Sequence, residues 1–206
     1  MSEAAKPSGH ERIETSNLLM IVLILAVVAV GGLVEIVPLY FQRSTTQPAP
    51  GVKPYTALQL AGRDVYLREG CYNCHSQMIR PLLAETLRYG TYSRAGEFVY
   101  DHPFQWGSKR TGPDLHRVGG KYSDEWQRLH LNNPRDLVPE SNMPAYPWLE
   151  KTQVASQEMA QRMTALRRVG VPYSDEEIAK AAADTAGKTE LDALIAYLQM
   201  LGTAVK

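Results

Sequence analysis

The chain has 206 residues, 44% of them hydrophobic, and its 22 Lys and Arg side chains balance 22 Asp and Glu side chains. A neutral chain lacks the basic footprint of a nucleic-acid-binding protein, so we expect no nucleic-acid partner. The length suits one medium domain with an appendage better than two full cores. The only two cysteines are Cys71 and Cys74, which excludes the disulfide framework of a small secreted domain.

The first predicted element is a transmembrane helix over residues 18–41. Residues 18–34 form a run of 17 residues without a charge, and the apolar character continues beyond Glu35. A helix over residues 18–41 is about 36 Å long, and the hydrocarbon core of a bilayer is about 30 Å thick. A cleaved signal peptide is the alternative, but its apolar core is usually about 7 to 15 residues long. We therefore expect a membrane anchor, with Glu35 close to the interface.

Residues 42–55 are rich in proline and glycine, which predicts an extended linker. We expect residues 56–206 to form one helical domain. Capping boxes and the spacing of apolar residues predict helices over residues 57–69, 123–131, 153–169, a segment that follows Ser174 and can break at Gly187, and 189–201. Most of the chain between residues 81 and 147 has no such periodicity and is expected to form ordered loops. A large prosthetic group would explain so much loop in a compact domain.

Cys71-Tyr72-Asn73-Cys74-His75 is a C-x-x-C-H motif, which is typical of c-type haem attachment. Each thiol can add to one haem vinyl group, and His75 is then the proximal ligand of the iron. A thioredoxin-like redox pair needs no histidine here, and zinc needs two more ligands, which no other histidine supplies at a typical finger spacing. The motif therefore predicts one covalently bound haem c.

The segment Gly112-Pro113-Asp114-Leu115 resembles the part of class I cytochromes c whose proline carbonyl accepts a hydrogen bond from the proximal histidine. The resemblance implies that Pro113 orients the ring of His75, as hydrogen-bond partners of metal ligands generally do. It also implies that Leu115 belongs to the haem environment. An ordinary proline turn is the alternative.

Met143 is the candidate for the second axial ligand of the iron. A thioether ligand raises the potential of an electron-transfer haem, and the prolines of the loop over residues 141–147 would hold Met143 rigidly. Met78 is too close to His75 in sequence to reach the other face of the haem. The methionines on predicted helices are expected to pack in the core, and four histidines receive no metal role: His10, His102, His116 and His130.

Three longer motifs resemble the mono-haem cytochrome c subunit, subunit II, of cbb3-type cytochrome c oxidases. They are REGCYNCHSQMIRP at residues 68–81, YDHPFQWGSKRTGPDL at residues 100–115 and VPESNMP at residues 138–144. The single N-terminal helix and the last helix also correspond, so the resemblance covers most of the chain. It implies an all-α fold, in which one transmembrane helix carries a class I cytochrome c-like domain with long ordered loops.

The resemblance also implies a relay of electrons without a substrate-converting site in this chain. The donor would be a di-haem cytochrome c subunit or another cytochrome c, and the acceptor the haem b-containing catalytic subunit, where oxygen reduction and proton pumping occur. In this family residues 106–115 face the catalytic subunit, and the position of Ser108 lies near a structural calcium, so a calcium ion at this interface is expected.

Haem attachment also predicts the topology of the chain, because c-type haem is attached outside the cytoplasmic membrane. Residues 1–17 would then be cytoplasmic and the haem domain periplasmic. The anchor helix would lie in the bacterial inner membrane. A membrane-tethered cytochrome c that shuttles between complexes is the main alternative function. A gas sensor would need an open iron position, against which Met143 argues, and a peroxidase would normally need a second C-x-x-C-H motif.

Overall fold

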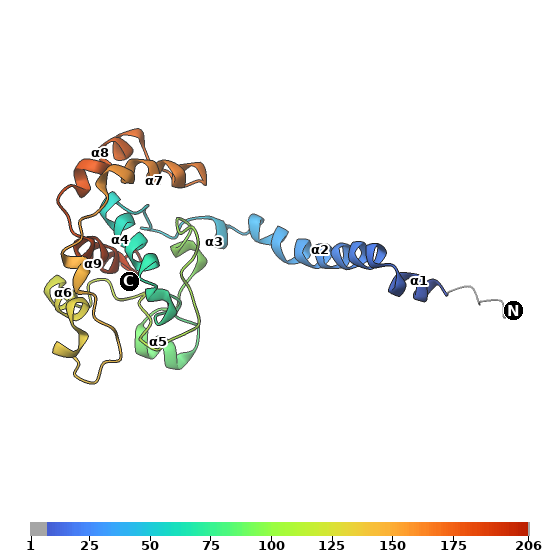
Figure 1. Ribbon diagram of the computed structural model, residues 1–206, viewed down its shortest axis with the longest axis horizontal. Helices are drawn as coiled ribbons and strands as arrows, with labels where there is room; N and C mark the ends of the chain where they lie inside the picture. Colours follow the sequence, from blue (N-terminus) through green and yellow to red (C-terminus); the bar gives the residue numbers. More distant parts are fainter. Residues whose placement is uncertain (1–7, 206) are drawn as a thin grey trace. The chain divides into compact units, whose positions relative to one another are not determined.

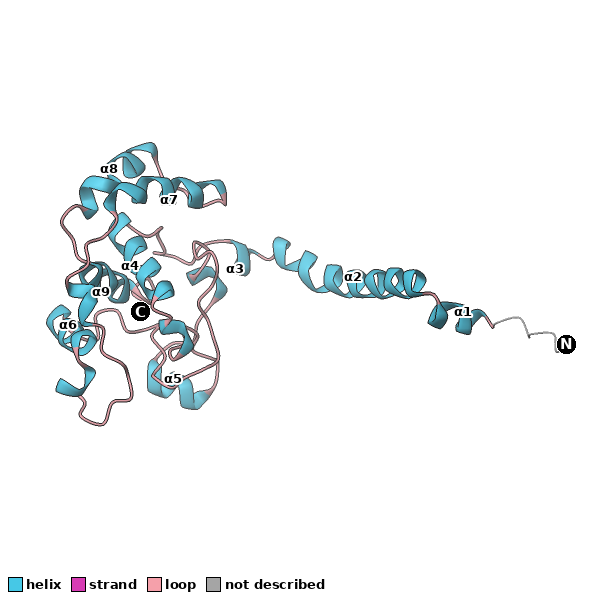
Figure 2. Cartoon of the chain, in the orientation of Figure 1, coloured by secondary structure: helices cyan, strands magenta, loops and turns pink. Residues whose placement is uncertain are grey.

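The computed structural model describes residues 8–205, and their regular secondary structure is helical (Figure 2). These residues include no strand, only one isolated antiparallel bridge between Gln153 and Thr189. The chain divides after Thr46 into two units, which are described separately. The prediction of an all-α protein is confirmed.

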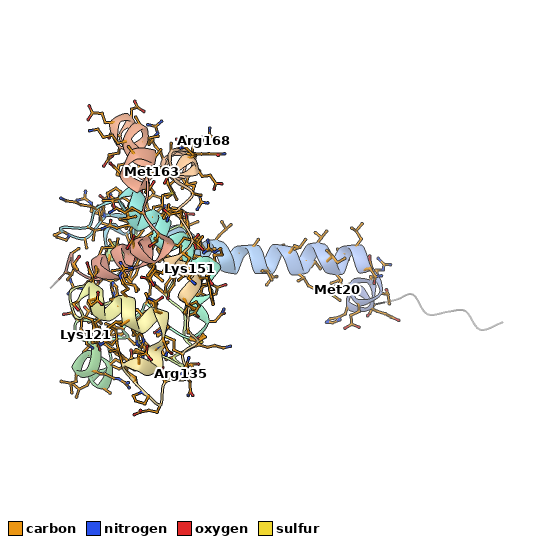
Figure 3. All side chains as sticks on the ribbon, turned by 60° about the vertical axis from the view of Figure 1, so that its left-hand side comes forward. Met20, Lys121, Arg135, Lys151, Met163 and Arg168 are labelled. Atoms are coloured by element: carbon orange, nitrogen blue, oxygen red, sulfur yellow. The ribbon has the colours of Figure 1, made fainter. Side chains whose placement is uncertain are left out.

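The N-terminal unit contains α1 (Gly9–Thr15), α2 (Asn17–Phe41) and α3 (Arg43–Thr46). Helix α2 has 25 residues, is long and apolar enough to cross a membrane, and buries none of its side chains, which project around the helix in Figure 3. The expected linker begins with a helical turn and not with extended chain. The hydroxyl groups of Thr45 and Thr46 donate to the carbonyl oxygen of Gln42 at 2.8 and 3.0 Å, which stabilises this turn locally.

The second unit contains the helices that were predicted and one that was not. The predicted ones are α4 (Ala57–Arg68), α6 (Asp124–Asn132), α7 (Ser156–Arg168), α8 (Asp175–Thr185) and α9 (Glu190–Met200). Capping boxes begin α4 at Thr56 and α8 at Ser174, as expected. Helix α7 starts three residues later than predicted, since Gln153 pairs with Thr189. The additional helix is α5 (Leu83–Tyr89), which lies at the opposite end of this unit from α7 and α8 (Figure 1).

Helices α4 and α9 cross at the centre of the second unit (Figure 1) and make its most extensive helix contact. The crossing depends on Gly62, because a Cβ atom at this position would lie 1.9 Å from the carbonyl oxygen of Ala193. Fully buried side chains surround it, among them Tyr66, Leu191 and Tyr197. The chain that follows α4 is therefore attached to the most rigid part of the core.

The long loops are tied to this core by buried polar contacts. Asp101 accepts hydrogen bonds from the Nε of Arg63 at 2.7 Å and from the Tyr55 hydroxyl at 2.8 Å, all three side chains being buried. The Gln77 side chain pairs with the hydroxyl of Tyr197 at 2.9 Å. Burying these polar groups is favourable only when they are hydrogen-bonded, so the loops containing Gln77 and Asp101 are held in defined positions.

Candidate haem-binding site

A tight turn after α4 presents the two cysteines. Gly70 has a φ of 70°, a left-handed conformation that suits glycine, and it precedes a 3-10 turn over Cys71–Asn73. The amide of Cys74 donates to the carbonyl oxygen of Cys71 at 3.1 Å, and that of His75 donates to the same oxygen at 2.9 Å. Cys71 is half-buried and Cys74 exposed, and neither forms a disulfide. Burial raises the pKa of the Cys71 thiol to about 12, so this thiol is neutral before any attachment reaction.

Asp114 fastens the chain after the cysteines to the segment that contains Pro113. Its buried carboxylate accepts hydrogen bonds from the Ser76 hydroxyl at 2.6 Å and from the amides of Met78 and His116, each at 2.8 Å. The amide of Leu115 also donates to the carbonyl oxygen of Ser76 at 2.9 Å. Asp114 lies within the motif at residues 100–115, but no role was predicted for it. The signal in the sequence was an acidic side chain inside a loop expected to be ordered.

This pairing brings His75 and Pro113 together in the way the sequence suggested. The Nδ1 of His75 lies 2.8 Å from the carbonyl oxygen of Pro113. Because a carbonyl oxygen can only accept, Nδ1 carries the hydrogen, and the lone pair of Nε2 is free for a metal. Burial lowers the pKa of His75, which favours the neutral imidazole that metal coordination needs.

Gly112 leaves the space that the ring of His75 occupies. A Cβ atom at this position would lie 2.3 Å from the Cε1 atom of His75. The amide of Gly112 donates to the carbonyl oxygen of Cys74 at 2.9 Å, so neither backbone can move aside without losing this bond. The glycine is therefore required by the packing of the proximal histidine.

The loop that contains Met143 is bound to the end of α6. The amide of Tyr146 donates to the carbonyl oxygen of Leu131 at 2.8 Å, and Nη1 of Arg135 donates to the carbonyl oxygen of Met143 at 3.0 Å. The Ser141 hydroxyl accepts from the amide of Met143 at 3.2 Å. Met143 itself is half-buried and packs against the core. The loop is thus held by Leu131 and Arg135, which lie outside it, and not by its prolines alone.

The pKa values of two residues outside the C-x-x-C-H motif depend on groups within it. Burial and, to a lesser extent, the charge of His75 lower the pKa of His130. Burial and then Cys71 and Cys74 raise the pKa of Tyr146. Residues of α6 and of the methionine loop therefore lie within electrostatic range of the C-x-x-C-H motif, although they are far from it in sequence.

The residues present fit a haem c. The Nε2 atom of His75 is available for a metal, and the thiols of Cys71 and Cys74 have no disulfide partner. The Nδ1 atom of His130, whose pKa is lowered by burial and then by the charge of His75, is buried without a hydrogen-bond partner in the part of the chain described. Buried polar atoms normally have partners, so such unpartnered atoms are expected around the site of a large group.

The remaining predicted site residues are Leu115 and Ser108. Leu115 is half-buried against the core, and its role in the haem environment stays a prediction. Ser108 is exposed, and residues 8–205 contain no cluster of three His, Cys, Asp or Glu side chains that could hold a metal ion. The calcium ion at Ser108 stays a prediction.

A family model described as cytochrome c oxidase, mono-heme subunit/FixO, matches residues 10–189. The chain belongs to this family. The match includes α2, the C-x-x-C-H motif, the segment around Asp114 and Met143, and it confirms the resemblance drawn from the sequence. Members of the FixO family are mono-haem subunits of cytochrome c oxidase, so this chain is an electron-transfer subunit of a cbb3-type oxidase, and one haem is expected in it. No curated protein matches the chain.

Proposed function

We propose that the chain passes single electrons through one covalently bound haem c to the haem b-containing catalytic subunit. The donor is a di-haem cytochrome c subunit or another cytochrome c. The receiving subunit reduces oxygen and couples this reaction to proton pumping, whereas the chain itself converts no substrate. The observation that carries the proposal is the hydrogen bond between His75 and Pro113, which leaves Nε2 of His75 free.

In this proposal Cys71 and Cys74 hold the haem through thioether bonds, and His75 and Met143 are the axial ligands. A haem with these ligands supplies a one-electron centre whose potential is raised by the thioether. The chain's own residues keep the ligands in place: Asp114 secures the segment that orients His75, and Arg135 secures the loop of Met143. A site that is held rigidly needs little rearrangement when the electron arrives or leaves.

We infer that the haem domain is periplasmic and anchored in the bacterial inner membrane. Residues 1–17 are cytoplasmic, residues 18–41 span the membrane, residues 42–55 form the linker and residues 56–206 bind the haem. The apolar helix α2 supports the anchor. The periplasmic orientation is supported by the chemistry of haem attachment, which takes place outside the cytoplasmic membrane.

Residues 106–115 are the proposed contact with the catalytic subunit. Phe104, just before this segment, is 44% exposed and stacks on Trp106 with ring centroids 5.1 Å apart. The buried Nε1 of Trp106 has no partner among the residues described. Exposed aromatic side chains next to a buried donor without a partner are common features of surfaces that another protein covers. An interface calcium near Ser108 belongs to the same proposal.

The test is purification of the native protein in mild detergent, with reduced-minus-oxidised spectra and a pyridine haemochrome assay on the intact assembly. We expect c-type and b-type haem to copurify with oxygen-reducing activity. A single c-type haem per chain, in a monomer without other haem, would identify a tethered electron shuttle and contradict the oxidase proposal. Strong carbon monoxide binding by the isolated reduced haem domain at neutral pH would contradict the axial role of Met143.

A further inference from the structure

Helix α5 presents leucine side chains on the surface of the second unit. Leu83 and Leu87 are 76% and 78% exposed, more than any other large apolar side chain described in this unit. They are four residues apart, so they lie on one face of the helix. Leu82, at the N-cap, is exposed as well. A cluster of exposed apolar side chains indicates a surface that contacts a protein or a membrane.

The exposed charges around these leucines are all positive. Residues 80–94 contain three arginines, which are exposed, and one acid, Glu85, which is buried and is paired with Arg80 and Arg110. The guanidinium groups of Arg88 and Arg94 lie over neighbouring tyrosine rings and have no carboxylate partner in the part of the chain described. Leucine, tyrosine and unpaired arginine are together typical of the interface of a phospholipid bilayer, because arginine binds phosphate and tyrosine lies at the level of the headgroups.

The segment that contains α5 is a loop with its two ends joined. The amide of Ser93 donates to the carbonyl oxygen of Ile79 at 2.9 Å, and the amide of Ile79 donates to the Ser93 hydroxyl at 2.8 Å. Residues 80–92 form the loop between these bonds. Nη2 of Arg110 binds its inner side through Glu85 at 2.8 Å. The leucine face is therefore attached firmly to the rest of the second unit.

The linker that follows the membrane helix is bonded next to the base of this loop. The amide of Ala49 donates to the carbonyl oxygen of Gly96 at 2.8 Å, and a Cβ atom at Gly96 would lie 3.0 Å from the carbonyl oxygen of Gln47. Between the end of α2 and Gln47 there are only residues 42–46, which span at most about 20 Å when fully extended. The linker therefore keeps Gly96, and the loop that ends three residues before it, within reach of the membrane surface.

We propose that α5 docks the haem domain on the phospholipid bilayer. Leu83 and Leu87 enter the headgroup region. Arg88 and Arg94 bind lipid phosphates. This inference rests on the proposed membrane anchor. The bilayer is favoured over a protein partner because the short linker brings the loop to the membrane whichever protein is bound. Docking at α5 stops the domain from turning freely on its linker, so the haem site faces a partner in the same membrane in one orientation.

Photocrosslinking in intact membranes tests this proposal. The full chain with its haem attached carries the photoreactive amino acid benzoylphenylalanine in place of Leu83, Leu87 or Val169, and it is irradiated in bacterial membranes. Mass spectrometry then identifies the molecule that is joined to each position. Val169 is the matched control: it is an apolar residue that is 58% exposed, and it follows α7, which lies at the opposite end of the unit from α5 (Figure 1).

We expect phospholipid adducts at positions 83 and 87 in yields several-fold higher than at position 169. Adducts with a protein chain in place of lipid would show that α5 is a protein interface. Equal yields at all three positions would show that α5 faces water. Either result would overturn the proposal. Failure of the proposed anchor would look different, because an alkaline wash would then release the chain from the membrane.

A second experiment tests the phosphate contacts. The chain with benzoylphenylalanine at position 87 is placed in nanodiscs of phosphatidylcholine, with or without phosphatidylglycerol. The anionic lipid should raise the yield of lipid adducts several-fold. Arg88→Gln combined with Arg94→Gln should abolish this increase, whereas Arg168→Gln, at an exposed position at the end of α7, should preserve it. An increase that persists without Arg88 and Arg94 would overturn the proposed contacts. All variants should keep the haem spectrum of the wild-type protein, since the replaced side chains are exposed.

Discussion

Three hydrogen bonds converge on the buried carboxylate of Asp114, from Ser76, Met78 and His116. Bonds to an ionised carboxylate are stronger than those between neutral groups, so this side chain can hold two loop segments that have no regular secondary structure. These bonds fix the position of Pro113, and the carbonyl oxygen of Pro113 orients the ring of His75. One acid that contacts neither the haem thiols nor the iron thus orients the proximal ligand.

A prediction for a single residue concerns Met143. The variant Met143→Ala tests whether this residue is the second axial ligand. We expect the variant to retain covalently bound haem, because the thioether bonds do not involve this residue. It should lose the low-spin spectrum of a six-coordinate haem and have a lower reduction potential, since the thioether favours ferrous iron. Optical spectroscopy and a redox titration measure both effects. An unchanged spectrum and potential would refute the assignment.

Among the elements, α5 forms because of its tertiary contacts. Its N-cap residue, Leu82, provides no side-chain hydrogen bond, and the helix has only seven residues. Glu85 holds it: its carboxylate accepts from the amide of Arg80 at 2.9 Å and from Nη2 of Arg110 at 2.8 Å. Arg110 in turn donates to Ser76 at 2.7 Å. Helix α5 is thereby connected to the segment that follows His75.

This network predicts a pH dependence of stability. The hydrogen bond from Arg110 is the main cause that lowers the pKa of Glu85 from 4.5 to about 2. A carboxyl group with a depressed pKa in the folded state stabilises it fully above pH 4.5, and that contribution is lost as the pH falls toward about 2. Glu85→Gln should therefore reduce the free energy of unfolding at neutral pH and flatten its decline in this window.

Chemical denaturation followed by circular dichroism at several pH values measures this effect. Some decline should persist in Glu85→Gln, because hydrogen bonds from His116 and Arg117 outweigh burial and lower the pKa of Glu97 to about 2 as well. Glu176→Gln, at an exposed position of α8, is the control and should behave like the wild-type protein. Parallel curves for wild-type and Glu85→Gln would show that the network does not stabilise the fold.

The close contact between helices α4 and α9 leads to a prediction about stability. Gly62→Ala places a methyl group 1.9 Å from the carbonyl oxygen of Ala193, so the helices must separate. We expect the domain to be destabilised by about 3 kcal/mol or more, as for severe overpacking. Thermal unfolding measures it. Gly31→Ala, also within a helix but with no atom within 4 Å of the added Cβ, should leave the Tm of the domain unchanged.

For the whole molecule, the prediction concerns topology. The charges that flank α2 do not decide it, since Lys6 and Arg12 on one side are matched by Arg43 and Lys53 on the other. Haem attachment requires the C-terminal domain to be periplasmic. Alkaline phosphatase needs disulfides that form in the periplasm. When this enzyme is fused after residue 206, it should be active in a bacterial host. A reporter that is active only in the cytoplasm should be inactive when it is fused at the same place. The reverse pattern would exclude a c-type haem in this domain.

Features that depend on neighbouring residues could be predicted from the amino-acid sequence. The C-x-x-C-H motif, the uncharged run of α2 and the capping boxes of α4 and α8 are complete within a few positions, so they predicted the family and most helices. Boundaries were less accurate where a distant partner intervened, as at Gln153, whose bridge to Thr189 delays α7. The roles predicted for Met143, Leu115 and Ser108 remain to be tested.

Contacts between side chains that are distant in sequence could not be predicted and are seen only in the folded chain. Ser76 and Asp114 are 38 residues apart, and Glu85 and Arg110 are 25 apart. The sequence does not indicate such pairs, because side chains that bond between loops do not occur at a regular spacing along the chain. The C-x-x-C-H motif can be recognised in the sequence because its residues are neighbours. The contacts that orient His75 form only when distant segments come together in the folded chain.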